Sequence, residues 1–316
     1  MTTTELQATI PEEMAGLRLD KALADLFPQH SRARLQQWLK DGQILVDDKK
    51  LKAKEKVTGG EVIQIDAPNE EQTEHIAQDI PLAIIYEDDD ILVINKAIDM
   101  VVHPAAGNAD GTILNAVLHH HPASRDLPRA GIVHRLDKDT SGLMVIAKTL
   151  IAHTNLVKQL QAREIKREYL AIVNGTVTAG GTIDEPIGRH SQQRMKMAVH
   201  PMGKEATTHY RIAERFHDYT LLHMQLESGR THQIRVHLAY INFPIVGDQT
   251  YGGRLKLPKN CDDSLRTLLQ QFKRQALHAY RLGLEHPITG EPCSWQADIP
   301  DDIQSIINGL REFNHA

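Results

Sequence analysis

A short segment of this 316-residue chain places ionisable residues between two apolar runs. Residues 131–148 read GIVHRLDKDTSGLMVIAK. The apolar residues at 132–133 and 143–146 predict buried strands, because short β-branched runs bounded by Gly and Ser are typical of strands. Charged groups between core strands are costly unless they are paired or used, so Asp137 is a candidate catalytic carboxylate. A solvated hairpin tip explains the same segment if it is considered alone.

Three motifs in sequence order resemble those of one enzyme family. HRLDKDTSGLMVIAKT, beginning at His134, resembles the signature loop of the RluA-type pseudouridine synthases, and the Asp of its HRLD corresponds to Asp137. Residues 167–171 (REYLA) and 226–237 (LESGRTHQIRVH) resemble the second and third motifs of that family. Upstream, INKA at 94–97 and VHP at 102–104 are similar to its opening element, so the likeness covers the chain from about residue 82 onward.

The resemblance implies a catalytic trio of Asp137, Tyr169 and Arg235. A carboxylate lowered into a pocket takes up a proton unless a partner keeps it ionised. The family's active-site arginine corresponds to Arg235, on a helix expected over residues 232–240 with Thr231 as its cap, and it would form an ion pair with Asp137. Tyr169 would supply an aromatic face and a phenol beside the target uracil. Arg135 would fill the gap that the displaced base leaves, or hold the displaced strand.

A locally basic unit precedes this region. Between residues 18 and 56 there are ten Lys or Arg and six Asp or Glu. Apolar spacing predicts a helix through Leu19 and Leu23, a second helix through Leu35 and Trp38 with Ser31 as its N-cap, and then short strands at 43–46 and 61–65. This order resembles the S4 RNA-binding domain. The resemblance implies phosphate contacts by Arg32, Arg34 and Lys50, although solvated helix charges are the alternative.

The remaining elements predict an α+β protein. Strands are expected at 91–94, 166–173, 207–213 and 219–226, and an amphipathic helix over 149–164, without regular alternation of strands and helices. The resemblance implies the pseudouridine synthase fold, a mixed and largely antiparallel central sheet with flanking helices. The expected division is a tail at 1–14, the S4-like domain at 15–75, an acidic linker at 76–84 and the catalytic domain at 85–316.

Composition excludes several other classes. Two cysteines fit neither a disulfide scaffold nor a zinc pattern, and no apolar run approaches the ~20 residues that cross a bilayer, so a cytoplasmic protein is expected. The 18 histidines include three consecutive ones at 119–121, directly before Pro122, which cannot all face one ion. The other candidate histidines lack the acidic neighbours that metal sites favour. No metal and no cofactor are therefore expected. A serine hydrolase would require a GxSxG elbow, and a kinase would require a glycine-rich loop.

The expected function is isomerisation of uridine to pseudouridine in 23S ribosomal RNA, in the large-subunit stem-loop that faces the small subunit. The partner would be that RNA or a large-subunit particle, bound by a monomer, with further phosphate contacts from Arg167, Arg194, Lys196 and Arg230. Asp137 would attack C1′, add to C6 or remove a ribose proton, and the sequence leaves the three paths open. The alternatives are another 23S site, a transfer RNA, or a non-catalytic RNA-binding assembly factor.

Overall fold

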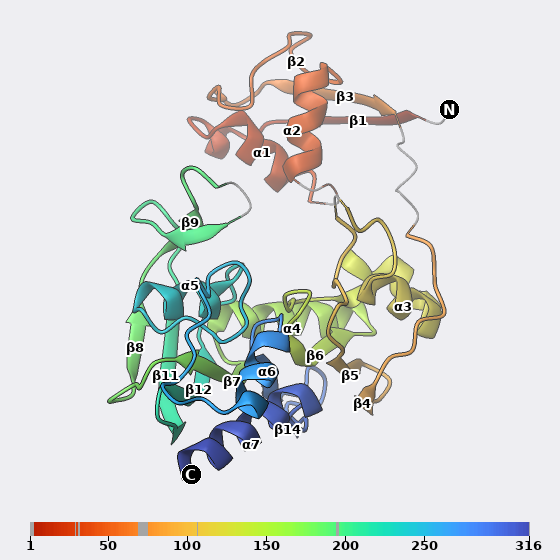
Figure 1. Cartoon of the computed structure of the whole chain (residues 1–316). Helices are drawn as coiled ribbons and strands as arrows, with labels where there is room; N and C mark the ends of the chain where they lie inside the picture. The colour runs from red at the N-terminus through yellow and green to blue at the C-terminus, as the bar shows by residue number, and fades with distance from the viewer. Residues whose placement is uncertain are drawn as a thin grey trace. The chain divides into compact units, whose positions relative to one another are not determined.

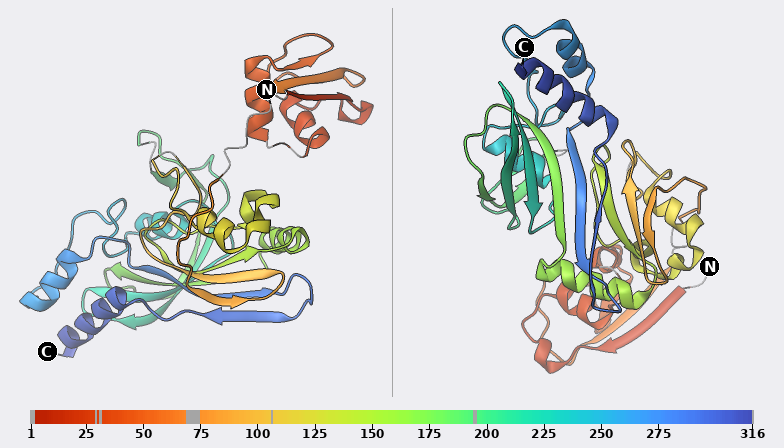
Figure 2. Two further views of the ribbon diagram at one scale, coloured as in Figure 1. Left: turned by 90° about the vertical axis from the view of Figure 1, so that its right-hand side faces the viewer. Right: turned by 90° about the horizontal axis from the view of Figure 1, so that it is seen from below.

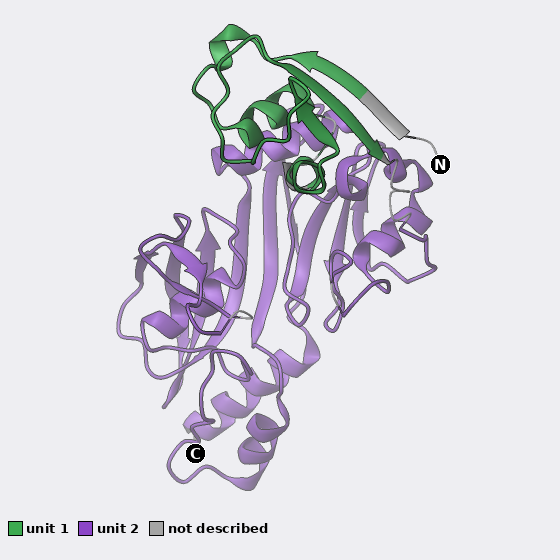
Figure 3. Ribbon diagram, turned by 90° about the horizontal axis from the view of Figure 1, so that it is seen from above, with its two compact units in different colours: residues 1–74 green, residues 75–316 purple. Residues whose placement is uncertain are grey.

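The chain folds into two compact units, Met1–Glu74 and His75–Ala316, in a computed structural model (Figures 1 and 3). The structure describes residues 3–28, 30, 32–68, 75–105, 107–193 and 196–315. The cap expected at Ser31 and the RNA contact expected of Arg194 lie outside these residues, and the side chain of Arg32 is likewise not described.

The first unit contains the predicted succession of helices and strands. Its elements are β1 (Thr3–Thr9), α1 (Leu19–Leu26), α2 (Arg32–Asp41), β2 (Ile44–Val46) and β3 (Val62–Pro68), with the sheet order β1-β3-β2. Leu19, Leu23 and Leu35 from the helices pack with Ile63 from the sheet in a core of their own. Residues 1–14, expected to be a tail, include β1, which pairs with β3 so that Leu6 faces Ile65. This edge strand is only weakly apolar, which explains why its pattern gave no strand prediction.

The second unit is built on a mixed sheet, in which the described residues form nine strands. The order is β4-β5-β6-β13-β7-β12-β11-β8, and β14 pairs with β13. Only the β6–β13 pair is parallel among the described strand pairs, so the predicted largely antiparallel sheet is confirmed. The strands are β4 (Ile84–Glu87), β5 (Ile91–Lys96), β6 (Ser141–Ala147), β7 (Lys166–Asn174), β8 (Gly181–Asp184), β11 (Thr207–Arg215), β12 (Tyr219–Leu226), β13 (Leu277–Glu285) and β14 (Pro292–Gln296).

Helices and a separate hairpin surround this sheet. The helices are α3 (Ile113–His120), α4 (Leu150–Ala162), α5 (Gln233–Tyr240), α6 (Asp263–Gln271) and α7 (Asp301–His315), and β9 (Ile187–Arg189) pairs with β10 (Met197–Val199). Both views of Figure 2 show α6 and α7 together at the end of the unit that holds the C-terminus. Ala77 and Leu82, within the predicted linker, pack against the core of this unit.

Both faces of the central strands are buried. Successive side chains of a strand point to opposite faces, so Met144 and Ile146 enter one core, together with α3, while Leu143 and Val145 enter another. Ala152 and Leu156 of α4 cover the second core. Because every residue of β6 is buried, this strand gives a rigid end to the loop that precedes it.

Gly142 permits the parallel contact at the start of β6. A Cβ atom there would lie 2.2 Å from the backbone oxygen of Ala279 in β13, and the residue has φ +121°. Only glycine combines this backbone conformation with so close an approach. The glycine of the signature loop therefore brings the loop's end against β13.

Candidate active site

The signature loop is tied to three other parts of the second unit. The buried Lys96 Nζ donates to the backbone oxygen of Lys138 at 2.9 Å, and Arg274 Nη1 donates to that of Asp139 at 3.3 Å. The His134 ring accepts at Nε2 from the backbone N–H of Val145 at 3.1 Å. These bonds satisfy the polar groups of a loop that lies between core strands, and they fix the backbone on both sides of Asp137.

Arg235 joins two carboxylates. Its Nη1 donates to Asp137 Oδ2 at 3.0 Å, while Nε and Nη2 form a bidentate pair with Asp248 at 2.7 and 2.9 Å. The Asp137 side chain is 19% exposed, whereas that of Asp248 is fully buried. Burial opposes the charge of Arg235, but the bonds to Asp248 and the charge of Asp137 outweigh it and raise the pKa of Arg235. The predicted ion pair between Asp137 and Arg235 is present.

Asp248 is fixed in turn by the chain that follows it. Its Oδ1 accepts the backbone N–H groups of Thr250 at 2.8 Å and Tyr251 at 3.0 Å. Burial would raise the pKa of Asp248, but the bonds from Arg235 and from these amides hold it below its usual range. Asp248 therefore stays ionised in a buried position and holds the guanidinium that faces Asp137.

His232 approaches the other oxygen of Asp137. Its Nε2 lies 4.0 Å from Asp137 Oδ1, and its Nδ1 lies 2.8 Å from the Tyr251 hydroxyl. That hydroxyl also accepts the backbone N–H of Met197 at 2.9 Å, so Tyr251 links His232 to the first residue of β10. Burial lowers the pKa of His232, opposed by the nearby Asp137 carboxylate, which favours the neutral form of the ring.

The expected cap at Thr231 is wrong. Helix α5 begins at Gln233, and its N-cap is His232, which has the left-handed conformation with φ 57° and ψ 23°. The Gln233 side chain closes the preceding turn, since its Oε1 accepts from Arg230 N at 3.0 Å and its Nε2 donates to Thr207 O at 3.0 Å. The turn directs His232 to Asp137 and leaves Thr231 on the pocket wall.

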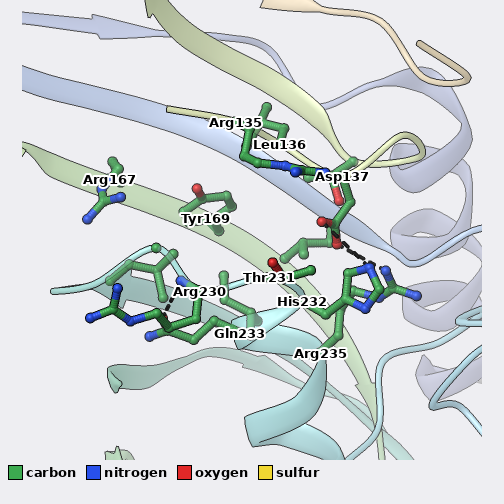
Figure 4. Close-up of a pocket in the computed structure, with 15 residues that line it drawn as sticks. Arg135, Leu136, Asp137, Arg167, Tyr169, Arg230, Thr231, His232, Gln233 and Arg235 are labelled. Carbon is green, nitrogen blue, oxygen red and sulfur yellow. Dashed lines mark hydrogen bonds and ion pairs between the residues drawn. The ribbon is translucent and has the colours of Figure 1, made fainter. Parts of the chain in front are cut away.

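Asp137 lies in a pocket with about 530 Å³ of empty space, which includes open solvent (Figure 4). Leu136, Leu226 and Leu277 provide an apolar wall. Tyr169 is 6% exposed and projects from β7, and burial raises the pKa of its phenol, which is therefore protonated at neutral pH. Among the described residues that line the pocket, Asp137 is the one carboxylate.

The structure gathers six of the predicted site residues in this pocket, namely Asp137, Tyr169, Arg235, Arg135, Arg167 and Arg230. Arg135 is exposed at its edge, and Arg230 donates from Nε to Glu205 O at 3.0 Å. Lys196 instead precedes β10 and does not line the pocket. Arg34 and Lys50 belong to the first unit, where the Arg34 guanidinium lies 5.3 Å from the centre of the Trp38 ring.

Sequence reasoning missed the roles of His232, Tyr251 and Asp248. His232 lies inside the third motif, at the first position of the helix expected over residues 232–240. Asp248 lies in the turn-forming segment GDQTYGG at 247–253. The signal that could have identified it is the need of a buried arginine for more than one acceptor. Within the described ranges, no three His, Cys, Asp or Glu side chains form a candidate metal cluster. Nor do these residues include a helix long and apolar enough to span a membrane.

Comparison of the chain with known proteins identifies the family to which it is similar. Residues 90–240 match the family model described as RNA pseudouridylate synthase, and residues 17–63 match that of the S4 domain. The chain is 58% identical over 308 residues to ribosomal large subunit pseudouridine synthase D of Yersinia pestis, covering 97% of this chain and 95% of the relative. It is 55% identical over 307 residues to the protein of the same name from Haemophilus influenzae, with 97% and 95% covered.

Solved structures share this fold. This chain and human RNA Pseudouridylate Synthase Domain Containing 4 superpose with a TM-score of 0.57 at 25% identity, covering 72% of this chain and 93% of the human one. The human domain-containing protein 1 gives a TM-score of 0.53 at 23% identity, with 74% and 96% covered, and supports the fold alone. Motifs, fold and relatives agree, and the chain belongs to the RNA pseudouridylate synthase family.

Proposed function

We propose that this pseudouridine synthase modifies uridines of the large-subunit ribosomal RNA, 23S RNA, with Asp137 as its catalytic carboxylate. The substrate follows from relatives that are named for the ribosomal large subunit and that are matched over 95% of their length. The S4-like unit supports an RNA partner, either the RNA itself or a large-subunit particle. The proposal extends to several uridines in the stem-loop that faces the small subunit, a monomeric enzyme without a cofactor, and a cytoplasmic location, where ribosomes are assembled.

One observation carries the catalytic assignment. Asp137 is held between the Arg235 guanidinium and the His232 Nε2 at the wall of a pocket that also contains Tyr169. The arginine pairs with the carboxylate, and the bidentate bond to Asp248 prevents the guanidinium from turning away. An oriented carboxylate beside an aromatic ring is what nucleophilic or basic chemistry on a nucleoside requires.

The reaction conserves every atom of the nucleotide. The bond from N1 to C1′ breaks, the uracil turns, a bond forms from C5 to C1′, the C5 proton leaves, and N1 gains a proton. Asp137 serves each of the three paths, because attack at C1′, addition at C6 and removal of a ribose proton all begin with an ionised carboxylate. Tyr169 would stack on the uracil, and its phenol is protonated and suited to exchange a proton with the base.

The target base must leave its stack before it reaches Asp137. Extrusion of a base costs a few kcal/mol and is easiest from a loop. Arg135, exposed at the pocket edge, is suited to occupy the space that the base leaves. Arg230, on the loop before α5, is suited to a phosphate contact, and Arg34, Lys50 and Lys196 extend the proposed RNA contacts beyond the pocket. The domain boundaries at 15–75, 76–84 and 85–316 belong to the same proposal.

The test is pseudouridine mapping of 23S RNA and of large-subunit particles after treatment with wild-type protein or with Asp137→Asn. Wild type should modify loop uridines, while the variant should bind the same RNA and modify none. Transfer RNA serves as the competing substrate. If the wild type binds 23S RNA and particles without modifying either, the alternative of a non-catalytic assembly factor replaces this proposal.

A further inference from the structure

Arg167 is a buried cation without an anionic partner among the described residues. It projects from β7 and is 7% exposed, yet no described carboxylate forms an ion pair with it. Its Nη2 donates to the backbone oxygen of Glu227 at 3.2 Å, and its Nε is buried without a hydrogen-bond partner. A buried guanidinium is costly to hold unless its charge and donors are satisfied, so this arrangement indicates a missing anionic ligand.

The guanidinium belongs to the catalytic pocket. Arg167 and Tyr169 are two positions apart on β7, so their side chains leave the same face of the strand about 7 Å apart along it. Figure 4 shows Tyr169 between Arg167 and Asp137, so the three line the pocket in sequence from the cation to the carboxylate. A nucleotide whose base stacks at Tyr169 has a phosphodiester on each side of its sugar, and one of these two groups can reach the guanidinium along this wall.

Gly229 provides the space for this arginine. A Cβ atom at residue 229 would lie 2.8 Å from Arg167 Nη1. The loop before α5 therefore approaches the guanidinium without covering it, and it contributes the neighbouring Arg230 to the same wall. An alanine at residue 229 would displace the guanidinium while leaving its charge unchanged.

We propose that Arg167 forms an anion subsite that receives the phosphodiester flanking the target uridine. An RNA chain offers this anion at each nucleotide, and a planar guanidinium donates to two phosphate oxygens at once. The inference rests on the proposed function, and it specifies which group of the substrate the buried cation recognises. Burial also lowers the pKa of Arg167, in keeping with a cation that lacks a protein counter-charge.

The experiment pairs Arg167→Gln with an RNA in which one phosphate is a neutral methylphosphonate. Affinity and the yield of pseudouridine are measured for the full-length wild type and variant, on RNAs altered at the 5′ or the 3′ side of the target uridine. One of the two linkages should weaken wild-type binding about 10- to 100-fold, as expected for a charge-assisted bond. Arg167→Gln should bind the RNA with this neutral linkage almost as tightly as it binds the unmodified RNA. Gly229→Ala should reduce this difference, and Arg266→Gln, in an exposed pair with Asp263, should leave it as in wild type.

Several results would overturn the proposal. If the 5′ and the 3′ methylphosphonate each weaken wild type and Arg167→Gln equally, no flanking phosphate reaches the guanidinium. If Arg167→Gln weakens binding of the unmodified RNA without coupling to either linkage, the residue contacts the base or only packs. Thermal unfolding provides a second readout, since removing an uncompensated cation should preserve or raise the melting temperature, whereas loss of a structural bond would lower it. Absence of product from wild type on natural RNA would count against the proposed function, and the linkage effect on affinity would still test the subsite.

Discussion

Tyr251 and His232 are joined through a hydrogen bond of 2.8 Å between the phenol oxygen and the ring Nδ1. The same phenol oxygen accepts the backbone N–H of Met197, at the first residue of β10. His232 in turn places its Nε2 4.0 Å from Asp137 Oδ1. The β9–β10 hairpin and the Asp137 carboxylate are thus connected through two side chains.

Tyr251→Phe should reduce kcat about 3- to 10-fold with little change in KM, the scale expected for one hydrogen bond. The phenylalanine retains the ring but removes the hydrogen bond to His232 Nδ1, so the imidazole is held less firmly beside Asp137. Single-turnover kinetics measure the effect. Tyr240→Phe is the matched control, since its exposed hydroxyl lies 3.4 Å from Glu185 and away from the pocket. Equal kinetics for the two variants would contradict the role assigned to Tyr251.

Asp248→Asn should destabilise the protein and weaken its control of Asp137. Breaking a buried ion pair costs about 3–5 kcal/mol of unfolding free energy, because the remaining charge loses its partner. Arg235 would be held less firmly and Asp137 oriented less well, so kcat should fall as well. Denaturant titration and single-turnover kinetics test the two effects. Asp263→Asn, at an exposed ion pair, should change neither, and an unchanged kcat would restrict Asp248 to stability.

Tyr169→Phe tests the contribution of the hydroxyl of this residue separately from that of its ring. The phenylalanine fills the same buried space, so RNA affinity and stability should stay close to wild type, while the rate of product formation should fall about 100-fold or more if the phenol moves a proton. Tyr169→Ala should cost about 3–5 kcal/mol in stability, because it leaves a cavity in the core. Full activity of Tyr169→Phe would show that the hydroxyl has no part in the reaction and that the residue acts only through stacking.

The stability of the protein should fall as the pH is lowered from 6.5 toward 3, in part through His134. Burial, reinforced by the charge of Arg167, lowers the pKa of His134 from its ordinary value of 6.5 to about 3. The unfolded chain binds a proton across this interval while the folded protein does not, so acid favours unfolding. His134→Gln should flatten the dependence of unfolding free energy on pH by up to about 1.4 kcal/mol per pH unit. Denaturant titrations at pH 6.5, 5.5 and 4.5 measure the slope, and an unchanged slope would contradict the assignment.

Gly142→Ala should prevent correct pairing of β6 with β13. Its Cβ would meet the Ala279 oxygen at 2.2 Å in a backbone conformation with φ +121°, so both the contact and the dihedral oppose it. Gly290→Ala separates the two effects, because residue 290 has φ +73° but no atom within 4 Å of the added Cβ. It should cost only about 1–2 kcal/mol of unfolding free energy. Comparable stability of both variants would show that the approach to Ala279 relaxes freely.

The sequence by itself determined the main elements and the chemical group at the centre of the site. The short apolar run at 143–146 predicted β6, and apolar spacing over 149–164 predicted α4, where the Thr149 side chain accepts the N–H of Ala152. These features depend on residues close together in the chain, so local patterns contain the necessary information. The order of the motifs, through the family resemblance, also anticipated the pairing of Asp137 with Arg235 across 98 positions.

Only the tertiary structure decided how that carboxylate is held. The left-handed conformation of His232 overrode the cap expected at Thr231, because the Gln233 side chain closes the turn through bonds to β11. Asp248 and Tyr251 join the site from a loop after α5, and Arg167 becomes buried because Gly229 approaches it from another segment. Each of these outcomes depends on contacts between elements that are distant in sequence. The fold decides which groups surround a residue, and these groups set its burial and its hydrogen bonds. The residue's neighbours in sequence do not specify them.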